Sequence, residues 1–110
     1  MRTILLILIV FFMSACQASP DVKGKIANWQ TLLTSEIPIG STKDQVIQWG
    51  EKRGIKFTFL EQQQELYAIA EKIPDPSGII CTEWNITIQI GIGANGISTN
   101  QKVGSVGACI

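Results

Sequence analysis

The sequence predicts an α+β domain in which two short N-terminal helices pack on an antiparallel sheet of three to four strands. Three observations predict this fold. Apolar side chains recur at helical spacing over residues 22–33, and a second helix-start signal follows at residue 42. Residues 82–92 alternate between polar and apolar side chains, as a half-buried strand does. Residues 21–110 have the length of one small domain with one modest core.

The first fifteen residues have the pattern of a bacterial secretory signal. A charged start at Arg2 precedes an unbroken apolar run over residues 4–13, and small side chains follow at Ser14 and Ala15. The run is shorter than the roughly 20 apolar residues that a membrane-spanning helix needs. The sequence therefore predicts an exported chain with residues 1–15 as its signal peptide.

Residues 13–16, Met-Ser-Ala-Cys, resemble the lipobox of bacterial lipoproteins. The resemblance implies that Cys16 carries the lipid anchor, with palmitate as a typical acyl chain, and that residues 16–20 form a lipidated tether. The alternative is an ordinary secretory signal cut after Ala18. Gln17 follows the cysteine, whereas the lipoprotein rule in Gram-negative cells reserves Asp there for the inner membrane. The expected location is the cell envelope, and in a Gram-negative cell the outer membrane facing the periplasm.

The first helix is expected to begin at residues 19–21, Ser-Pro-Asp, which supply a capping hydroxyl, a proline at the first helical position and an acid in the first turn. Residues 37–40, Ile-Pro-Ile-Gly, should break it. A helix lying on the membrane surface would need a broader basic face than Lys23 and Lys25 supply. The apolar stripe is therefore expected to face the core, and it consists of Val22, Ile26, Trp29 and Leu33.

A second helix is expected to begin after Thr42. The hydroxyl of Thr42 can cap the helix, and Gln45, three residues later, completes a capping box. Gly54 is expected to end the helix. Its buried side should consist of Val46, Ile47 and Trp49 or Gly50.

A strand is expected over residues 55–60, but residues 60–73 are ambiguous. Their Glu, Gln, Leu and Ala content favours a helix, whereas alternating apolar side chains favour a strand from about Leu66. Residues 74–78, Pro-Asp-Pro-Ser-Gly, predict a turn in either case. As a strand, the segment would carry Tyr67, Ile69 and Ile73 on one face and Leu66, Ala68 and Ala70 on the other.

The last two strands are expected to form a hairpin around a three-residue loop at residues 94–96. Counting outward from this loop places Cys81 directly opposite Cys109. Once Cys16 carries lipid, these two cysteines are an even remainder in a compartment where disulfides persist. The sequence therefore predicts a disulfide that closes the last hairpin and adds roughly 3 to 4 kcal/mol to the free energy of unfolding.

This register leaves one mismatch. Val103 would point away from the apolar row of the preceding strand. A bulge near Gly104 would repair the mismatch, or the outer face of the sheet is partly covered as well. Without a bulge, the row of Trp84, Ile86, Ile88 and Ile90 would face Val106, Gly104, Lys102 and Asn100.

Residues 91–96, Gly-Ile-Gly-Ala-Asn-Gly, spell the dinucleotide-binding pattern G-x-G-x-x-G. That motif requires a following helix and an acidic residue about 20 positions later. A stretch rich in Ser, Thr and Val follows here instead, so we interpret the glycines as turn residues. No small-molecule cofactor is expected.

Two helices followed by an antiparallel sheet, behind a lipobox, resemble small outer-membrane lipoproteins of the SmpA/OmlA type. The local match is residues 39–46, Ile-Gly-Ser-Thr-Lys-Asp-Gln-Val, which are similar to the helix start of that family, and Gly50 stands at its helix-ending glycine. The resemblance implies an accessory role in β-barrel assembly. The same layout also resembles secreted inhibitors of β-lactamase.

The composition argues against catalysis, metal binding and nucleic-acid binding. The chain contains no histidine, which removes the commonest general base and the commonest zinc ligand. Its nine basic and nine acidic residues leave no net charge and no basic patch for nucleic acid. Oxidised cysteines would leave no thiolate nucleophile. Four glutamates could form an acid–base pair but are expected to be surface charges: Glu61, Glu65, Glu71 and Glu83.

We therefore expect a non-catalytic, envelope-anchored protein that binds another envelope protein as a scaffold or accessory subunit. Its membrane contact is expected to run through the lipid on Cys16. One alternative is an inhibitor or immunity-type lipoprotein that neutralises a toxin or lysozyme-like enzyme through the turn at residues 74–78. A third hypothesis, a small-ligand or cell-wall binder, requires an exposed tryptophan among Trp29, Trp49 and Trp84.

Overall fold

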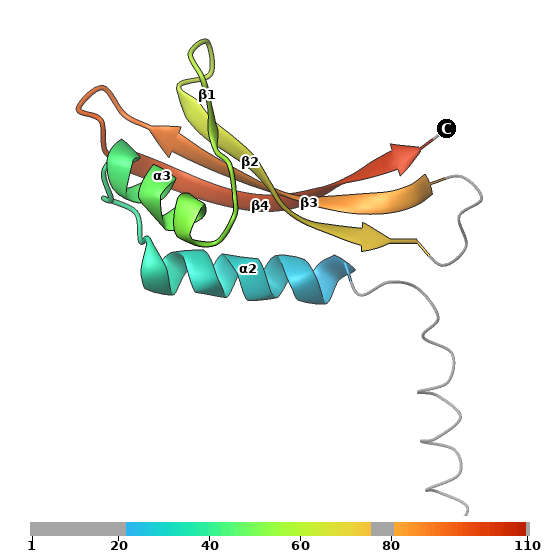
Figure 1. Ribbon diagram of the computed structural model, residues 1–110. Coiled ribbons are helices and arrows are strands. Elements are labelled where there is room, and N and C mark those ends of the chain that lie inside the picture. The colour runs from blue at the N-terminus through green and yellow to red at the C-terminus, as the bar shows by residue number, and fades with distance from the viewer. Residues whose placement is uncertain (1–21, 76–80, 110) are drawn as a thin grey trace, which may run out of the picture.

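The computed structural model describes residues 22–75 and 81–109, except for the side chains of residues 81, 82 and 109. The chain forms helix α2 (Val22–Glu36), helix α3 (Lys43–Lys52) and strands β1 (Thr58–Leu60), β2 (Glu65–Pro74), β3 (Cys81–Ile92) and β4 (Ser98–Cys109). The strands make one antiparallel sheet in the order β1-β2-β3-β4 (Figure 1). The predicted α+β class, with two helices and an antiparallel sheet, is confirmed.

Several predictions fall outside the described residues. These are the signal peptide (1–15), Cys16 with the tether (16–20), the first helix cap (19–21) and most of the predicted turn, from residue 76 to residue 78.

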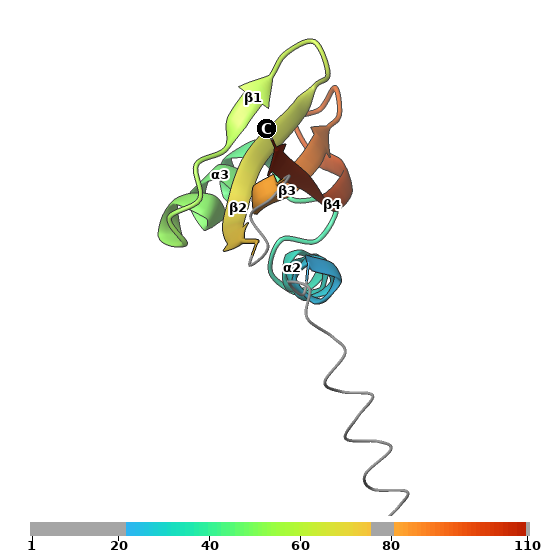
Figure 2. The same ribbon diagram turned by 90° about the vertical axis from the view of Figure 1, so that its right-hand side faces the viewer.

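The core lies between the sheet and the two helices, as Figure 2 shows for α2 seen nearly end-on beneath β3 and β4. Leu33 of α2 and Val46 of α3 are fully buried in the same cluster as the central strands. The strand residues of this cluster are Leu66, Ile86, Ile88, Ile90, Ile92 and Val103. Burying side chains of this size stabilises a fold by about 1.5 to 3 kcal/mol each, so this one cluster holds both helices on the sheet.

Both helices follow the sequence prediction. In α2 the other members of the stripe, Val22, Ile26 and Trp29, are half-buried against the core. The capping box of α3 is present: the Gln45 backbone N–H donates to Thr42 Oγ1 over 3.1 Å, and the Thr42 N–H donates to Gln45 Oε1 over 2.8 Å. Gly54 follows the end of α3 with a φ of 72°, as a stop residue should.

Gly50 has a different role from the helix end that the resemblance implied. It lies inside α3, where a Cβ atom would come within 2.7 Å of the Ile55 carbonyl oxygen and within 2.8 Å of the Phe57 ring. Glycine here lets the chain after α3 pass directly across the helix. The expected strand at 55–60 is correspondingly shorter, since pairing starts only at Thr58.

The ambiguous segment is a strand, as the alternation favoured. A bulge at Ala70 shifts the register between Ile69, opposite Thr87, and Glu71, opposite Ile86. The predicted faces are correct as far as Ile69 and wrong beyond the bulge. Glu71 and Ile73 lie on the helix-covered face, because the extra residue reverses which face the following side chains take.

The predicted register of the last hairpin is wrong by one residue over most of its length. A shift beside Gly91 leaves Thr99 unpaired, so Ile88 faces Val103 and both are buried. A bulge therefore removes the predicted mismatch at Val103, but this bulge lies at Thr99 and not near Gly104. A second shift, between Cys81 and Glu83, restores the original register at the end of the hairpin.

As a result, the backbone ladder pairs Cys81 with Cys109, as counting from the turn predicted. The two side chains lie outside the described residues, so the disulfide stays a prediction.

Candidate functional site

The four candidate glutamates are not brought together. Glu61 is exposed in the loop before β2, and Glu71 lies on the helix-covered face. Glu65 and Glu83 lie on the opposite face. Glu65 begins β2, whereas Glu83 belongs to β3 and pairs with Pro74 at the other end of β2. Nine residues of strand separate them by about 30 Å. These carboxylates therefore form no acid–base pair with one another.

Each of the three tryptophans donates its indole N–H to a carboxylate. Trp29 donates to Glu71 over 3.0 Å, Trp49 donates to Glu36 over 3.0 Å, and Trp84 donates to Asp75 over 3.2 Å. All three indoles are half-buried. Half-buried indoles need a partner for their N–H, and the sequence carried no spacing signal for these pairs because the partners are distant along the chain.

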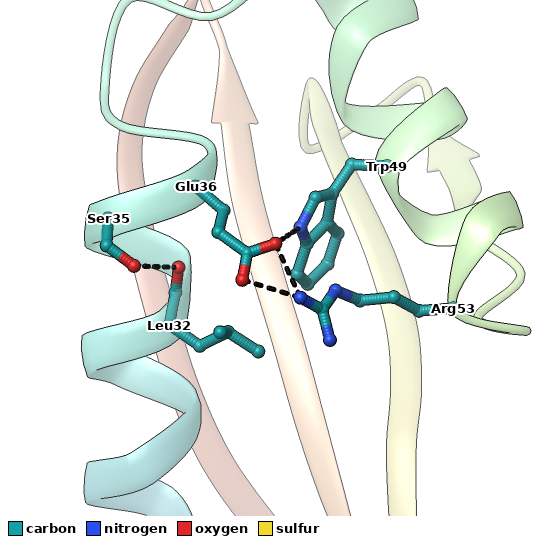
Figure 3. Close-up of polar contacts among 5 residues, drawn as sticks. All are labelled: Leu32, Ser35, Glu36, Trp49 and Arg53. Carbon is teal, nitrogen blue, oxygen red and sulfur yellow. Dashed lines mark hydrogen bonds and ion pairs between the residues drawn. The ribbon is translucent and has the colours of Figure 1, made fainter.

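Glu36 joins the end of α2 to α3 (Figure 3). Its carboxylate accepts hydrogen bonds from Trp49 and from the Arg53 guanidinium, which also lies 5.2 Å from the centre of the Trp49 ring. The hydrogen bond from Arg53, followed by that from Trp49, lowers the pKa of Glu36. This junction links the end of α2 to α3 on the outside of the molecule.

Glu71 makes the equivalent junction between β2 and the middle of α2. It accepts the Trp29 hydrogen bond, and Lys25 Nζ lies 3.1 Å from its other oxygen. The Trp29 hydrogen bond, followed by that from Lys25, lowers the pKa of Glu71. The bulge at Ala70 explains why a carboxylate stands on the core face at all, and these two donors offset its partial desolvation.

Two open hollows adjoin these junctions. One of about 430 Å³ lies beside Glu36 and Trp49, between the end of α2 and the outer side of α3. The other, of about 310 Å³, lies beside Trp29 and Glu71. The carboxylate in each hollow is already bonded to an indole and to a cation. Both junctions therefore fit a structural role in orienting the helices better than an acid–base role.

The opposite face of the sheet carries no helix among the described elements. Ile69 and Val106 on this face are 41% and 54% exposed, and Tyr67 is half-buried. Lys72 and Lys102 are exposed on the same face, and neither forms an ion pair with a carboxylate in the part of the chain that the structure describes. This helix-free face therefore combines apolar side chains and two lysines, on β2 and β4, with the polar side chains of β3 between them.

Sequence reasoning placed part of this face wrongly. Without the bulge at Thr99, Lys102 and Val106 were expected opposite the apolar row that faces the core. The observed partners are Gln89 for Lys102 and Asn85 for Val106, both on the helix-free face. The only available signal was the mismatch of Val103.

Strand β4 forms one edge of the sheet, and α2 lies under it (Figure 2). The strand has twelve residues and contains neither proline nor an acidic side chain. Long edge strands usually carry protective features. In β4 these include Lys102, the bulge at Thr99 and the loop after α2, which pairs with Ser98.

Neither α2 nor α3 is long and apolar enough to cross a membrane. Within the described ranges, no three acidic or cysteine residues cluster in a way that could hold a metal ion. Comparison of the chain with protein-family models, with characterised proteins and with solved structures finds no match to any of them.

Proposed function

We propose that this protein is an envelope-anchored lipoprotein that acts, without catalysis, as a protein-binding scaffold or accessory subunit. The observation that carries the proposal is the combination of a long edge strand, β4, with a helix-free face that exposes Ile69, Val106 and two lysines without an acidic partner among the described residues. Surfaces of this kind bind extended segments of other proteins by strand addition and side-chain contact.

The proposed anchor is a lipid on Cys16, after removal of residues 1–15 as signal peptide, with residues 16–20 as the tether. The lipobox resemblance and the apolar run before it support this assignment. In a Gram-negative cell it places the domain at the outer membrane, facing the periplasm. Such an anchor would hold the binding surface close to envelope proteins.

The proposed disulfide joins Cys81 to Cys109. Its support is the antiparallel ladder, which places the two residues directly opposite each other, and opposed positions meet the Cα distance that a disulfide needs. The bond would fasten the open ends of β3 and β4, and so keep the edge strand in place.

The resemblance to SmpA/OmlA lipoproteins supports an accessory role in the assembly of outer-membrane proteins. It rests on the order of elements, two helices and then an antiparallel sheet, and on the capped start of α3. Fold alone does not decide function, so the partner must be found by experiment.

The test is crosslinking of the tagged, lipidated protein in its own cells, followed by purification from the membrane fraction and identification of the bound proteins by mass. Cys16→Ala is the mislocalised control. We expect lipidation-dependent recovery of one resident envelope complex. Recovery of no resident protein would contradict the scaffold proposal and favour the alternative, an inhibitor or immunity-type lipoprotein acting on a toxin or lysozyme-like enzyme.

A further inference from the structure

Among the described residues, the outer edge of β4 is paired with another segment at its Ser98 end. The loop after α2 takes the position of a fifth strand beside Ser98, where the Gly40 N–H donates to the Ser98 carbonyl and the Ser98 N–H donates to the Ser41 carbonyl. Thr42 and Ile97 form an antiparallel bridge at the same place. Over residues 99–107 no backbone hydrogen bond to a segment outside the sheet is found in the described ranges. The edge therefore offers a row of backbone donors and acceptors for one more strand.

Three residues of this edge face the helix-free side at alternate positions: Lys102, Gly104 and Val106. Gly104 is the informative one. A Cβ atom there would meet only Thr87 Oγ1, at 3.6 Å, which is ordinary contact, and its φ is not positive. Neither packing nor backbone conformation requires glycine, so this position presents no side chain on the helix-free face, beside the buried Thr87.

These side chains define what an added antiparallel strand should carry. An aliphatic residue would match the exposed Val106, and a carboxylate would match Lys102, which has no acidic partner among the described residues. A large aromatic residue would lie over Gly104, because cross-strand aromatic side chains cover edge glycines. Since the strands would run antiparallel, the order along the partner is aliphatic, aromatic, acidic at alternate positions.

A second copy of this chain fits the edge poorly. An antiparallel pair of β4 strands would be related by a two-fold axis perpendicular to the sheet. Because α2 packs against β4 more than against β3, the two α2 helices would be crowded side by side beneath the joined edges. Packed helices need about 8 to 10 Å between their axes. A single extended segment has no such conflict.

We propose, resting on the protein-binding function above, that the edge of β4 from residue 99 to residue 107 binds an extended segment of a partner protein as a fifth antiparallel strand. The segment carries an aliphatic, an aromatic and an acidic side chain at alternate positions, which lie over Val106, Gly104 and Lys102.

The test uses the mature chain with Cys16→Ala, so that lipid does not interfere. The probe is a short fluorescent threonine peptide with Val, Tyr and Glu at three alternate positions. We expect saturable binding, together with slower amide exchange within residues 99–107. Lys102→Glu should weaken binding about fivefold, and a peptide with Lys in place of Glu should restore it.

Two variants sharpen the result. Lys72→Glu makes the same charge change on the same face, but on β2, two strands away, and should alter binding less than about twofold. Gly104→Val places a side chain over this position, where a Cβ meets only ordinary contact. Once urea unfolding shows its stability to be unchanged, it should bind the Tyr peptide more weakly than a peptide with Ala in place of Tyr.

The proposal is overturned by absence of peptide binding, by equal effects of Lys72→Glu and Lys102→Glu, by protection outside β4, or by dimerisation of the chain through this edge. If crosslinking in cells recovers a resident partner while the peptide fails, the protein-binding function stands and the strand-addition mode is wrong. If crosslinking recovers none, the function itself fails. Adding vesicles of anionic lipid as competitors tests whether the edge binds membrane instead of protein. Lipid should not displace the peptide.

Discussion

Glu71 shows how one residue can depend on a backbone irregularity. Had β2 continued without its bulge, Glu71 would lie on the helix-free face and Ala70 on the core face. The extra residue turns Glu71 towards α2, where Trp29 and Lys25 meet it. A carboxylate left alone on that face would be costly. The two donors are therefore what makes the position tolerable, and α2 gains a polar contact that fixes its position along the strand.

Glu36 and Glu71 predict a pH dependence of stability. Both have a pKa below the ordinary value in the folded chain, because each accepts an indole hydrogen bond and pairs with a cation. A lowered pKa adds stability that is present above the ordinary Glu value, about 4.3, and is lost as the pH falls towards the folded value. We expect the free energy of unfolding, measured in urea, to fall between about pH 5 and pH 3. The Glu36→Gln/Glu71→Gln variant should lose less over this range.

The matched control for this prediction is Glu51→Gln/Glu61→Gln, which removes two exposed carboxylates that contact neither an indole nor a cation in the described hydrogen bonds and ion pairs. It should follow the pH dependence of the unchanged chain. If both double variants flatten the curve equally, the two junctions do not carry the effect.

Gly50 and Gly104 make a matched pair of glycines. Gly50→Ala should lower the free energy of unfolding by about 1 to 3 kcal/mol, because its Cβ would lie 2.7 Å from a backbone oxygen that cannot easily move. Gly104→Ala meets only a 3.6 Å contact and should be neutral or slightly stabilising. Urea unfolding of both variants checks this. Equal destabilisation would show that crowding at Gly50 does not decide the outcome.

At the scale of elements, the sequence predicted those features that depend on interactions between residues close together along the chain. The capping box at Thr42 is satisfied within three residues of chain, so its sequence pattern was sufficient. Strand β2 was predicted by alternation alone, although its composition also suited a helix, because packing of Leu66 and Ala68 against β3 overrides propensity. The order of elements was therefore readable from the sequence.

The positions of the bulges could not be predicted from the sequence. The bulge at Thr99 is accompanied by contacts across the hairpin: the Asn100 side chain accepts from the Gly91 N–H, and Thr99 Oγ1 donates to the Gly91 carbonyl. No periodic pattern encodes such contacts. Because one extra residue moves every following side chain to the other face, this single event decided that Lys102 and Val106 belong to the candidate surface. The candidate site was therefore less predictable than the fold.

The cap of α3 can be tested directly. Thr42→Ala removes the acceptor for the Gln45 N–H and should lower the free energy of unfolding by about 1 kcal/mol. Thr42→Ser keeps a hydroxyl and should recover most of the loss. The comparison variant is Thr34→Ala in α2, whose hydroxyl only bonds the Gln30 carbonyl within the same helix, and it should change little in urea unfolding. A loss at Thr34 as large as that at Thr42 would contradict the capping role.

The hairpin provides the next prediction. Mass spectrometry of the exported protein, alkylated with and without prior reduction, should show Cys81 and Cys109 protected from alkylation until reductant is added. The Cys81→Ser/Cys109→Ser variant should lose about 3 kcal/mol of stability. Single Cys81→Ser should expose Cys109 to alkylation without reductant. Two reactive thiols in the exported chain would reject the disulfide, and the pairing of the strands would then rest on the ladder alone.

At the scale of the whole molecule, the two helices share one core. Leu33 and Val46 enter the same buried cluster from different helices, and Glu36 bridges the helices on the outside. A domain this small, with a single cluster, should unfold in one cooperative step. Both helices and the sheet also carry their own reporter, since Trp29 lies in α2, Trp49 in α3 and Trp84 in β3.

We therefore expect the three indole N–H resonances of the mature chain to disappear at the same urea concentration in a proton–nitrogen NMR titration. Each resonance depends on a carboxylate elsewhere in the fold, Glu71, Glu36 or Asp75, so the three report the α2–sheet contact, the α2–α3 contact and a contact within the sheet. Leu33→Ala should shift all three midpoints together, by an amount equivalent to about 2 to 5 kcal/mol. If α2 were only loosely attached, the Trp29 resonance would vanish first and Leu33→Ala would move it alone. In that case α2 could leave the sheet under mild conditions, and the underside of β4 would become a second surface open to partners.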